Sequence, residues 1–277
     1  MSFYQNEVTE KIDSATKGLE LLVRSNFADD PKANLIISHG LAEFSERYDK
    51  TASYFTARGY NVFRYDQLGH GDSDGDRGYL ASPADLSDNL EVIVNLVKER
   101  FPNLSLFVLG HSMGGETVLL HATKFPNEVD GYVATDPVST YSHPTMGDLP
   151  FEGDGKDKIP NSLGAGLVSD PRVLKKYQEH KKTLHQLTIG IFNNGLWEGA
   201  LSLRKNLDKI VDPILLLQGL EDGLVSYQDT LEAYPHISSK DKELHVYPFL
   251  QHEILNEPSR NQEILAEIDS WISKHIY

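Results

Sequence analysis

The stretch Leu104-Ser105-Leu106-Phe107-Val108-Leu109-Gly110-His111-Ser112-Met113-Gly114-Gly115 decides the fold. Its first six residues form a largely apolar run with the length of a buried β-strand. Residues 116–122, Glu-Thr-Val-Leu-Leu-His-Ala, have the composition of a helix. Glycines on both sides of Ser112 let a strand and a helix approach each other closely. The stretch therefore predicts a strand, a tight turn at Ser112 and a helix.

Short apolar runs alternate with segments of helical period along most of the chain. Strands are predicted at Asn34–Ser38, Asn61–Tyr65, Leu104–Leu109, Tyr132–Thr135, Ile214–Gln218 and Glu243–Tyr247. A hairpin turned at Lys17-Gly18 opens the chain, and a terminal helix runs from about Ser259 to His275. Another helix begins near Ser82, with Ser82 as its cap and Pro83 in its first turn. This alternation is typical of an α/β fold, a mostly parallel sheet with helices on both faces.

The regular alternation breaks after Thr135 for about seventy residues, which is too long for an ordinary connection. Residues 143–166 are rich in Gly and Pro, and residues 171–203 have the pattern of helices. We therefore expect a core of residues 1–138 and 206–277, with residues 139–205 inserted as a cap. The 277 residues are enough to bury one sizeable core.

Composition excludes several partner classes. The formal net charge is −15, which disfavours nucleic acid because phosphate binding needs clustered Lys and Arg. No apolar run is long enough to span a bilayer, so any membrane contact is expected to be transient. Residues 1–13 have no apolar core typical of a secretory signal, and a cytoplasmic location is expected. The absence of cysteine rules out disulfides, thiolate metal sites and a cysteine nucleophile.

Two segments match Gly-x-Ser-x-Gly, one centred on Ser112 and the other on Ser73. Only Ser112 lies directly between a predicted strand and a predicted helix, as a nucleophilic serine on such a turn requires. Asp72 and Asp74 flank Ser73, and their charges would oppose an oxyanion nearby. Ser112 is therefore the predicted nucleophile, and Ser73 is interpreted as a turn residue.

A serine hydroxyl needs a histidine to accept its proton and an acid to orient that histidine. His252 follows the strand Glu243–Tyr247 by one short loop, which would bring it to the carboxyl edge of the sheet beside Ser112. His245 lies within that strand, while His236 and His275 are interpreted as surface histidines. His252 is the predicted base.

The predicted acid is Asp222, in the loop that follows the strand Ile214–Gln218. The neighbouring Glu221 is a weaker candidate for this acid. Asp136 is the other alternative, because it ends the strand Tyr132–Thr135 and some proteins of this fold place the acid there. Asp222 is preferred over both.

Residues 39–41, His-Gly-Leu, follow the strand that ends at Ser38. A loop there can supply one oxyanion donor, the backbone N–H of Leu41, with the N–H of Met113 as the second. The side chains of His39, His70 and His111 are interpreted as structural.

These blocks together resemble the monoacylglycerol lipase and lysophospholipase branch of the α/β-hydrolases, over nearly the whole chain. The resemblance is carried by His39-Gly40-Leu41-Ala42-Glu43 with Arg47-Tyr48, by Asp66-Gln67-Leu68-Gly69-His70-Gly71-Asp72-Ser73, by Gly110-His111-Ser112-Met113-Gly114-Gly115, by Leu217-Gln218-Gly219 with Asp222, and by His252. It implies a Ser112, Asp222 and His252 triad, an oxyanion hole of Leu41 and Met113, and a cap above the site. It implies no metal and no organic cofactor.

The expected activity is hydrolysis of a carboxylic ester, with a single-chain lipid as the expected substrate and an acyl-enzyme on Ser112. Alternatives with the same triad are a small-ester or feruloyl-type esterase, a thioesterase and a short-peptide aminopeptidase. A non-catalytic ligand-binding protein is the alternative of another class. Several cap side chains could line an acyl pocket, although packing against the sheet is their more ordinary role: Leu184, Ile189, Phe192, Leu196 and Trp197.

Overall fold

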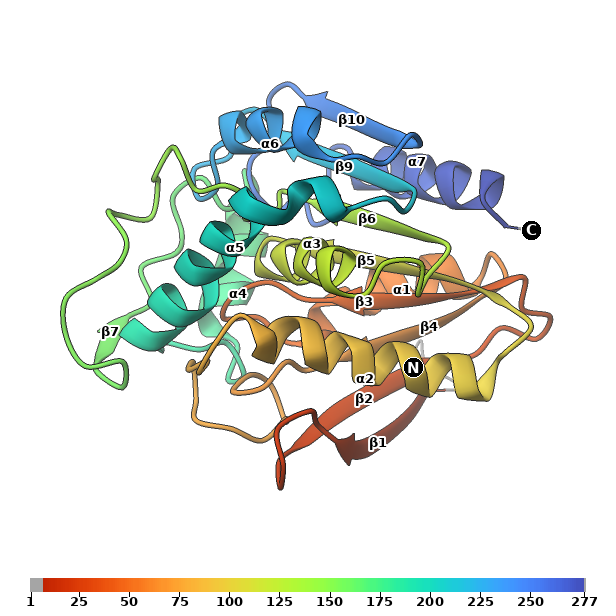
Figure 1. The fold of residues 1–277 in the computed structure, drawn as a ribbon, viewed down its shortest axis with the longest axis horizontal. Helices are drawn as coiled ribbons and strands as arrows, with labels where there is room; N and C mark the ends of the chain where they lie inside the picture. Colours follow the sequence, from red (N-terminus) through yellow and green to blue (C-terminus); the bar gives the residue numbers. More distant parts are fainter. Residues whose placement is uncertain (1–6, 277) are drawn as a thin grey trace.

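The computed structural model describes residues 7–276, and an eight-stranded sheet forms its centre (Figure 1). In spatial order the strands are β1 (Glu7–Asp13), β2 (Glu20–Asn26), β4 (Tyr60–Tyr65), β3 (Ala33–Ser38), β5 (Ser105–His111), β6 (Gly131–Thr135), β9 (Ile214–Gly219) and β10 (Lys242–Tyr247). The β1–β2 and β2–β4 pairs are antiparallel, and the other neighbouring pairs are parallel. The predicted α/β class and the opening hairpin are confirmed. Residues 1–6, which begin the stretch interpreted as lacking a secretory signal, lie outside the described residues.

The central strands are largely apolar because both faces of the sheet are buried. Successive side chains point to opposite faces, so Leu35 and Ile37 join one hydrophobic cluster while Ile36 joins the other. This explains why the sequence has continuous apolar runs instead of an alternation of apolar and polar residues.

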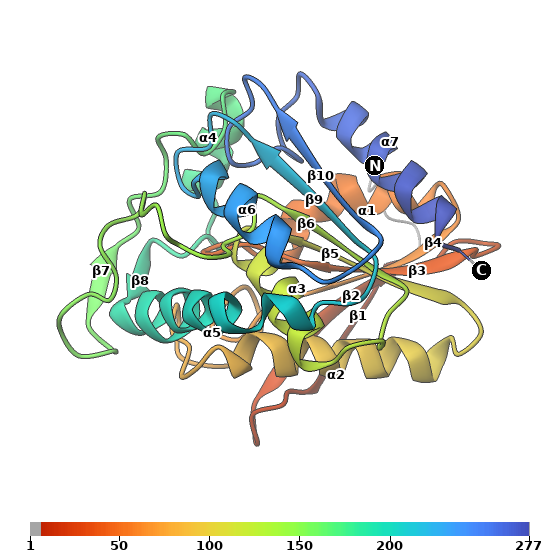
Figure 2. The ribbon, with the colours of Figure 1, turned by 45° about the horizontal axis from the view of Figure 1, so that its top comes forward.

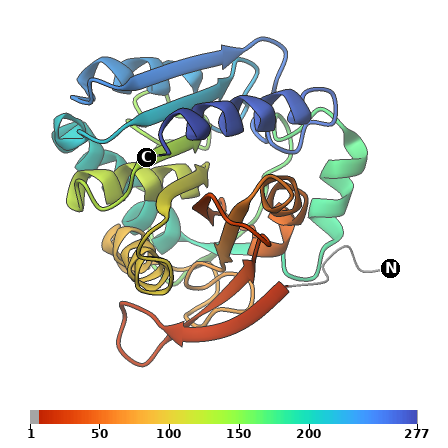
Figure 3. The ribbon, with the colours of Figure 1, turned by 90° about the vertical axis from the view of Figure 1, so that its right-hand side faces the viewer.

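Helices cover both faces, as Figures 2 and 3 show. One face packs against α1 (Asp49–Thr56) and α7 (Asn261–Lys274). The other packs against α2 (Ala84–Arg100), α3 (Met113–Lys124) and α6 (Tyr227–Ala233). Because the parallel strands all end at the same edge, the loops after them meet there. None of the helices formed by the described residues is long and apolar enough to cross a bilayer.

The predicted start of α2 was right in place but wrong in its cap. Ser82 makes no side-chain capping bond to the helix. Instead Oδ2 of Asp85, inside the first turn, accepts hydrogen bonds from the N–H groups of Ala81 at 2.7 Å and Ser82 at 3.2 Å. A carboxylate reaching backwards thus replaces the expected hydroxyl.

The first part of the segment 139–205 lies beyond one end of the sheet strands, on the left in Figure 1, whereas α5 (Glu198–Asn206), at its end, runs back and packs against α3. The segment was expected to be helical from residue 171, but its helices are interrupted by a small antiparallel sheet. Its elements are β7 (Lys158–Pro160), α4 (Pro171–Glu179), β8 (Gln186–Thr188), a π-helical turn (Ile191–Trp197) and most of α5. This two-stranded sheet was missed because each strand has only three residues, too few for a visible period.

Candidate active site

Ser112 lies on the turn between β5 and α3, as predicted. Its backbone has φ 56° and ψ −118°, a conformation that non-glycine residues seldom adopt and that is often found at functional sites. The turn is tight: a Cβ on Gly114 would lie 2.1 Å from the carbonyl oxygen of Ser38. Only glycine therefore lets α3 begin so close to β3.

Ser112 lines a pocket with about 390 Å³ of empty space, part of which is open to solvent. Apolar side chains form much of its wall, and polar groups gather at one part of it. The lining residues are Gly40, Leu41, Glu43, His111, Ser112, Met113, Val138, Met146, Leu163, Leu167, Tyr177, Leu196, Leu224, His252 and Glu253. Of the cap side chains considered for an acyl pocket, only Leu196 is among them.

His252, which lines this pocket, contacts Asp222. Nδ1 of His252 lies 2.8 Å from Oδ2 of Asp222. The other carboxylate oxygen of Asp222 accepts the N–H groups of Leu224 at 2.8 Å and Val225 at 2.9 Å. Burial disfavours the charged imidazole, but the adjacent Asp222 carboxylate outweighs it and raises the pKa of His252. The arrangement holds Nδ1 protonated and leaves Nε2 free to accept a proton.

The alternative bases and acids are engaged elsewhere. His245 pairs with Glu267, and Nε2 of His275 lies 3.0 Å from Asp241. Glu221 is exposed to solvent. Asp136 is fully buried near the pair, but it makes no hydrogen bond to His252; its Oδ1 accepts the N–H of Gly219 at 2.8 Å.

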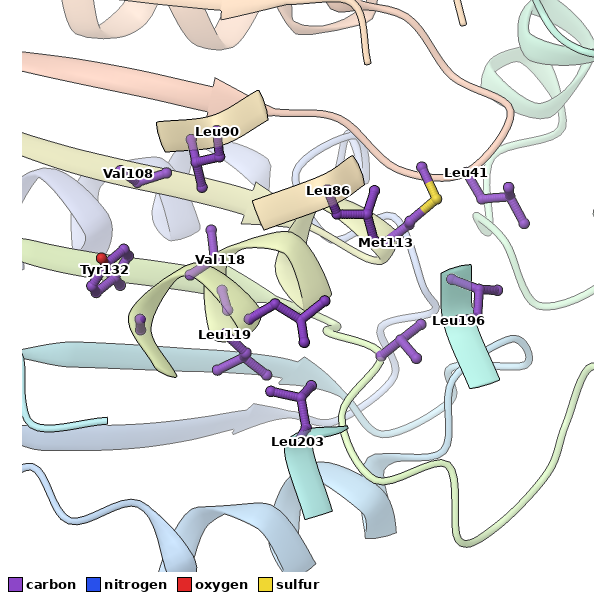
Figure 4. Close-up of a cluster of buried hydrophobic side chains, with 14 of the residues drawn as sticks. Leu41, Leu86, Leu90, Val108, Met113, Val118, Leu119, Tyr132, Leu196 and Leu203 are labelled. Carbon is purple, nitrogen blue, oxygen red and sulfur yellow. The ribbon is translucent and has the colours of Figure 1, made fainter. Parts of the chain in front are cut away.

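Leu41 and Met113 both line the pocket beside Ser112. Their side chains belong to the same buried cluster, drawn in Figure 4. Neither backbone N–H donates a hydrogen bond to another of the residues 7–276. Two unengaged donors next to a serine are what an oxyanion hole requires.

His39, His70 and His111 are buried and tie loops together. Nε2 of His39 accepts the N–H of Gln67 at 3.0 Å, and Nε2 of His70 accepts that of Ala42 at 3.2 Å. Burial lowers the pKa of His70 and of His111 to about 3, so both rings are neutral. Nδ1 of His111 lies 3.0 Å from Oγ1 of Thr135.

A buried charged cluster, formed by Glu43, Arg47 and Glu253, lies at the polar part of the pocket. Nε of Arg47 lies 3.1 Å from Oε1 of Glu43, and its Nη2 lies 2.6 Å from Oε2 of Glu253. The ring of Tyr177, from the inserted segment, covers the guanidinium at 4.6 Å. Burial alone would raise the pKa of Glu43, but Arg47 lowers it to about 2.

Sequence reasoning assigned no role to this cluster. Two signals were available: Glu43 and Arg47 are opposite charges four residues apart, and Glu253 directly follows the predicted base. Both are also common on ordinary surfaces, and only the fold reveals that the three side chains are buried together.

The inserted segment is bonded to the loops that carry the acid and the base. The carbonyl oxygen of Gly166 accepts the N–H of His252 at 3.1 Å and that of Gly223 at 3.3 Å. The carbonyl of Leu167 accepts the N–H of Glu253 at 2.7 Å. The segment therefore braces both loops.

A group of potential metal ligands, His143, Asp229 and Glu232, lies away from this pocket. Oδ1 of Asp229 already accepts the N–H groups of Ser142 at 2.9 Å and His143 at 3.0 Å. The carboxylate thus has a structural role in holding the loop.

The sheet order, the helices on both faces and the strand-to-helix turn at Ser112 define an α/β-hydrolase. A family model described as serine aminopeptidase, S33, matches residues 29–259. The chain belongs to this family and is a hydrolase of the lipase or esterase type.

Several relatives are similar over most of their length. The chain is 30% identical to a monoacylglycerol lipase of Mycolicibacterium smegmatis, covering 89% of this chain and 90% of the relative. It is 28% identical to a monoglyceride lipase of Rattus norvegicus, covering 89% and 84%. A solved structure of a soluble variant of monoglyceride lipase from Saccharomyces cerevisiae, in complex with a substrate analog, has a TM-score of 0.85 at 21% identity, covering 100% of this chain and 98% of that chain.

Proposed function

We propose that the chain is a serine esterase that hydrolyses monoacylglycerols through an acyl-enzyme on Ser112. The observation that carries the proposal is the pocket in which Ser112, the Asp222–His252 pair and the N–H groups of Leu41 and Met113 come together. The names of the relatives support the choice of substrate.

The proposed reaction has two steps. Oγ of Ser112 attacks the ester carbonyl while Nε2 of His252 accepts its proton, and Leu41 and Met113 donate hydrogen bonds to the oxyanion. The imidazolium then protonates the departing alcohol. In the second step His252 takes a proton from water, which attacks the acyl-enzyme. The imidazolium then returns this proton to Oγ of Ser112 as the fatty acid leaves.

The division of the pocket supports a substrate with one polar and one apolar end. Side chains such as Val138, Leu167 and Leu196 would contact the acyl chain. The cluster of Glu43, Arg47 and Glu253 offers charged partners for the hydroxyl groups of the alcohol. In this proposal residues 139–205 form a cap over the acyl chain.

A substrate panel tests the proposal. We expect wild type to have a higher kcat/KM for 1-monooleoylglycerol than for p-nitrophenyl butyrate, because the longer chain buries more apolar surface. Because a caffeoylshikimate esterase of Arabidopsis thaliana is 26% identical, a caffeoyl ester and a peptide amide belong in the panel. Preference for either of these two would replace the proposed substrate, and full activity in Ser112→Ala would remove the proposed nucleophile.

A further inference from the structure

A second carboxyl group, that of Asp136, is buried beside the proposed triad, and the proposed reaction does not use it. Asp136 follows β6, is 0% exposed and has φ 46°. Its N–H donates to the carbonyl of Leu217 at 2.8 Å. Its Oδ1 accepts the N–H of Gly219 at 2.8 Å, so it anchors the start of the loop that carries Asp222.

One amide links this carboxyl to the triad. Nε2 of Gln218 lies 3.1 Å from Oδ1 of Asp136 and 3.1 Å from Oδ2 of Asp222. Oε1 of the same side chain accepts the hydroxyl of Thr230 at 2.7 Å, which fixes the amide orientation. A carboxylate oxygen of each Asp and a ring nitrogen of His252 all lie within 4.8 Å of one another. Asp136 is thus within a small side-chain movement of the imidazole.

The two carboxyls differ in how their oxygens are engaged. Both oxygens of Asp222 accept hydrogen bonds. Oδ2 of Asp136 is buried and has no hydrogen-bond partner among the described residues. Nδ1 of His111, the titratable group facing it from β5, is 4.0 Å away on a neutral ring.

Burial and the adjacent Asp222 charge raise the pKa of Asp136 well above its ordinary value. The N–H groups of Gly219 and Ile254 act in the opposite direction, and they are outweighed. Asp136 therefore keeps its proton more readily than an ordinary carboxylic acid.

We propose that Asp136 is a positioning residue held in reserve for His252. With Asp222 present, the neutral Asp136 anchors the acid loop without adding a second negative charge beside the imidazole. When Asp222 is removed, its repulsion ends and Asp136 gives up its proton to water more readily, against the burial that remains. Its carboxylate then partly replaces Asp222 in orienting His252. This inference rests on the proposed triad.

A double-mutant cycle tests the proposal, with kcat/KM for p-nitrophenyl butyrate measured from pH 5 to 10. We expect Asp136→Asn alone to lower kcat/KM about fivefold and Asp222→Ala alone about 10²-fold, because the reserve carboxylate remains. The double variant should fall about 10⁴-fold, so that Asp136→Asn costs far more when Asp222 is absent. The lost activity of Asp222→Ala should also partly return as pH rises and Asp136 ionises.

Two results would overturn the proposal. Equal kcat/KM for Asp222→Ala and the double variant would mean that Asp136 gives His252 no support. An equal cost of Asp136→Asn in both backgrounds would mean a purely structural anchor. If Asp136→Asn does not fold, Asp136→Ser keeps a hydroxyl that cannot ionise in this range, and Asp222→Asn can replace Asp222→Ala. Esterase activity that is present in wild type and absent from Ser112→Ala establishes the parent proposal separately.

Discussion

The chain contains the same five-residue pattern twice, around Ser112 and around Ser73, and the two serines have different surroundings. Ser112 has a strained backbone between a strand and a helix, and it lines the pocket. Ser73 lies in the loop after β4, where its Oγ donates to the carbonyl of Asp66 at 2.5 Å and accepts the N–H of Leu22 at 2.8 Å. The pattern alone therefore does not identify a nucleophile, whereas the elements on either side of it do.

The glycines of the two patterns also serve different purposes. A Cβ on Gly114 would meet the backbone of β3, so this glycine brings the nucleophile helix close to the sheet. A Cβ on Gly71, which has φ 47°, would lie 2.1 Å from Oδ2 of Asp66. That carboxylate accepts the N–H of Asp72 at 2.8 Å. Gly71 therefore allows the loop to fold around the carboxylate of Asp66.

The largest expected difference is in catalysis. Ser112→Ala should lower ester hydrolysis by about 10⁴-fold or more, since removing a nucleophile leaves only the contribution of binding and the oxyanion donors. Ser73→Ala should keep activity within a fewfold of wild type, because both partners of its hydroxyl are backbone groups of residues that do not line the pocket. Initial rates and labelling by a fluorophosphonate probe measure both variants. A probe adduct on Ser73, or loss of activity in Ser73→Ala with the fold intact, would reverse the assignment.

Much of this site could be predicted from the sequence because strand ends at one edge of a parallel sheet meet in space. Ser112, Asp222 and His252 each follow an apolar run, and the structure brings the last two into contact. The buried cluster of Arg47 and its two glutamates could not be predicted. Arg47 and Glu253 are 206 residues apart, and no local pattern records their pairing.

The same limit applies to the cap. Leu184, Ile189, Phe192 and Trp197 have the composition expected of an acyl pocket, yet none of them lines it. Met146, Leu163 and Leu167 do line it, although they come from a stretch rich in Gly and Pro that has no clear period. Which apolar side chains face a pocket depends on tertiary packing, which periodicity does not encode.

The second expected difference is in pH dependence, because in the proposed mechanism only Ser112 transfers its proton to an imidazole, that of His252. His252 must be neutral to act as a base, and the Asp222 carboxylate, outweighing burial, raises its pKa above the ordinary value. As pH falls below this raised pKa, kcat/KM should fall about tenfold per pH unit. The midpoint of this fall should lie above the pKa of an ordinary histidine, which is about 6.5.

Profiles of kcat/KM for p-nitrophenyl butyrate from pH 5 to 9 locate this midpoint, with Ser73→Ala as the matched control. The two profiles should coincide. A midpoint well below that of an ordinary histidine would mean that burial outweighs Asp222 in the free enzyme. A shifted midpoint in Ser73→Ala alone would couple the second serine to the site.

The smallest expected effect is on stability, where Ser73→Ala should cost more free energy of unfolding than Ser112→Ala. Ser73→Ala leaves the N–H of Leu22 and the carbonyl of Asp66 without the hydroxyl that joins them. A buried polar group left unpaired costs about 1–3 kcal/mol, so we expect the free energy of unfolding to fall by about 2 kcal/mol. Urea unfolding followed by circular dichroism measures the change, with Ser82→Ala as control because Ser82 is only partly buried and its side chain caps nothing. Ser112→Ala should unfold within about 1 kcal/mol of wild type or become more stable, since strained active sites are commonly held at the expense of stability. If Ser73→Ala were as stable as Ser82→Ala, the hydroxyl would not hold the loop to β2, and the second pattern would have no structural purpose.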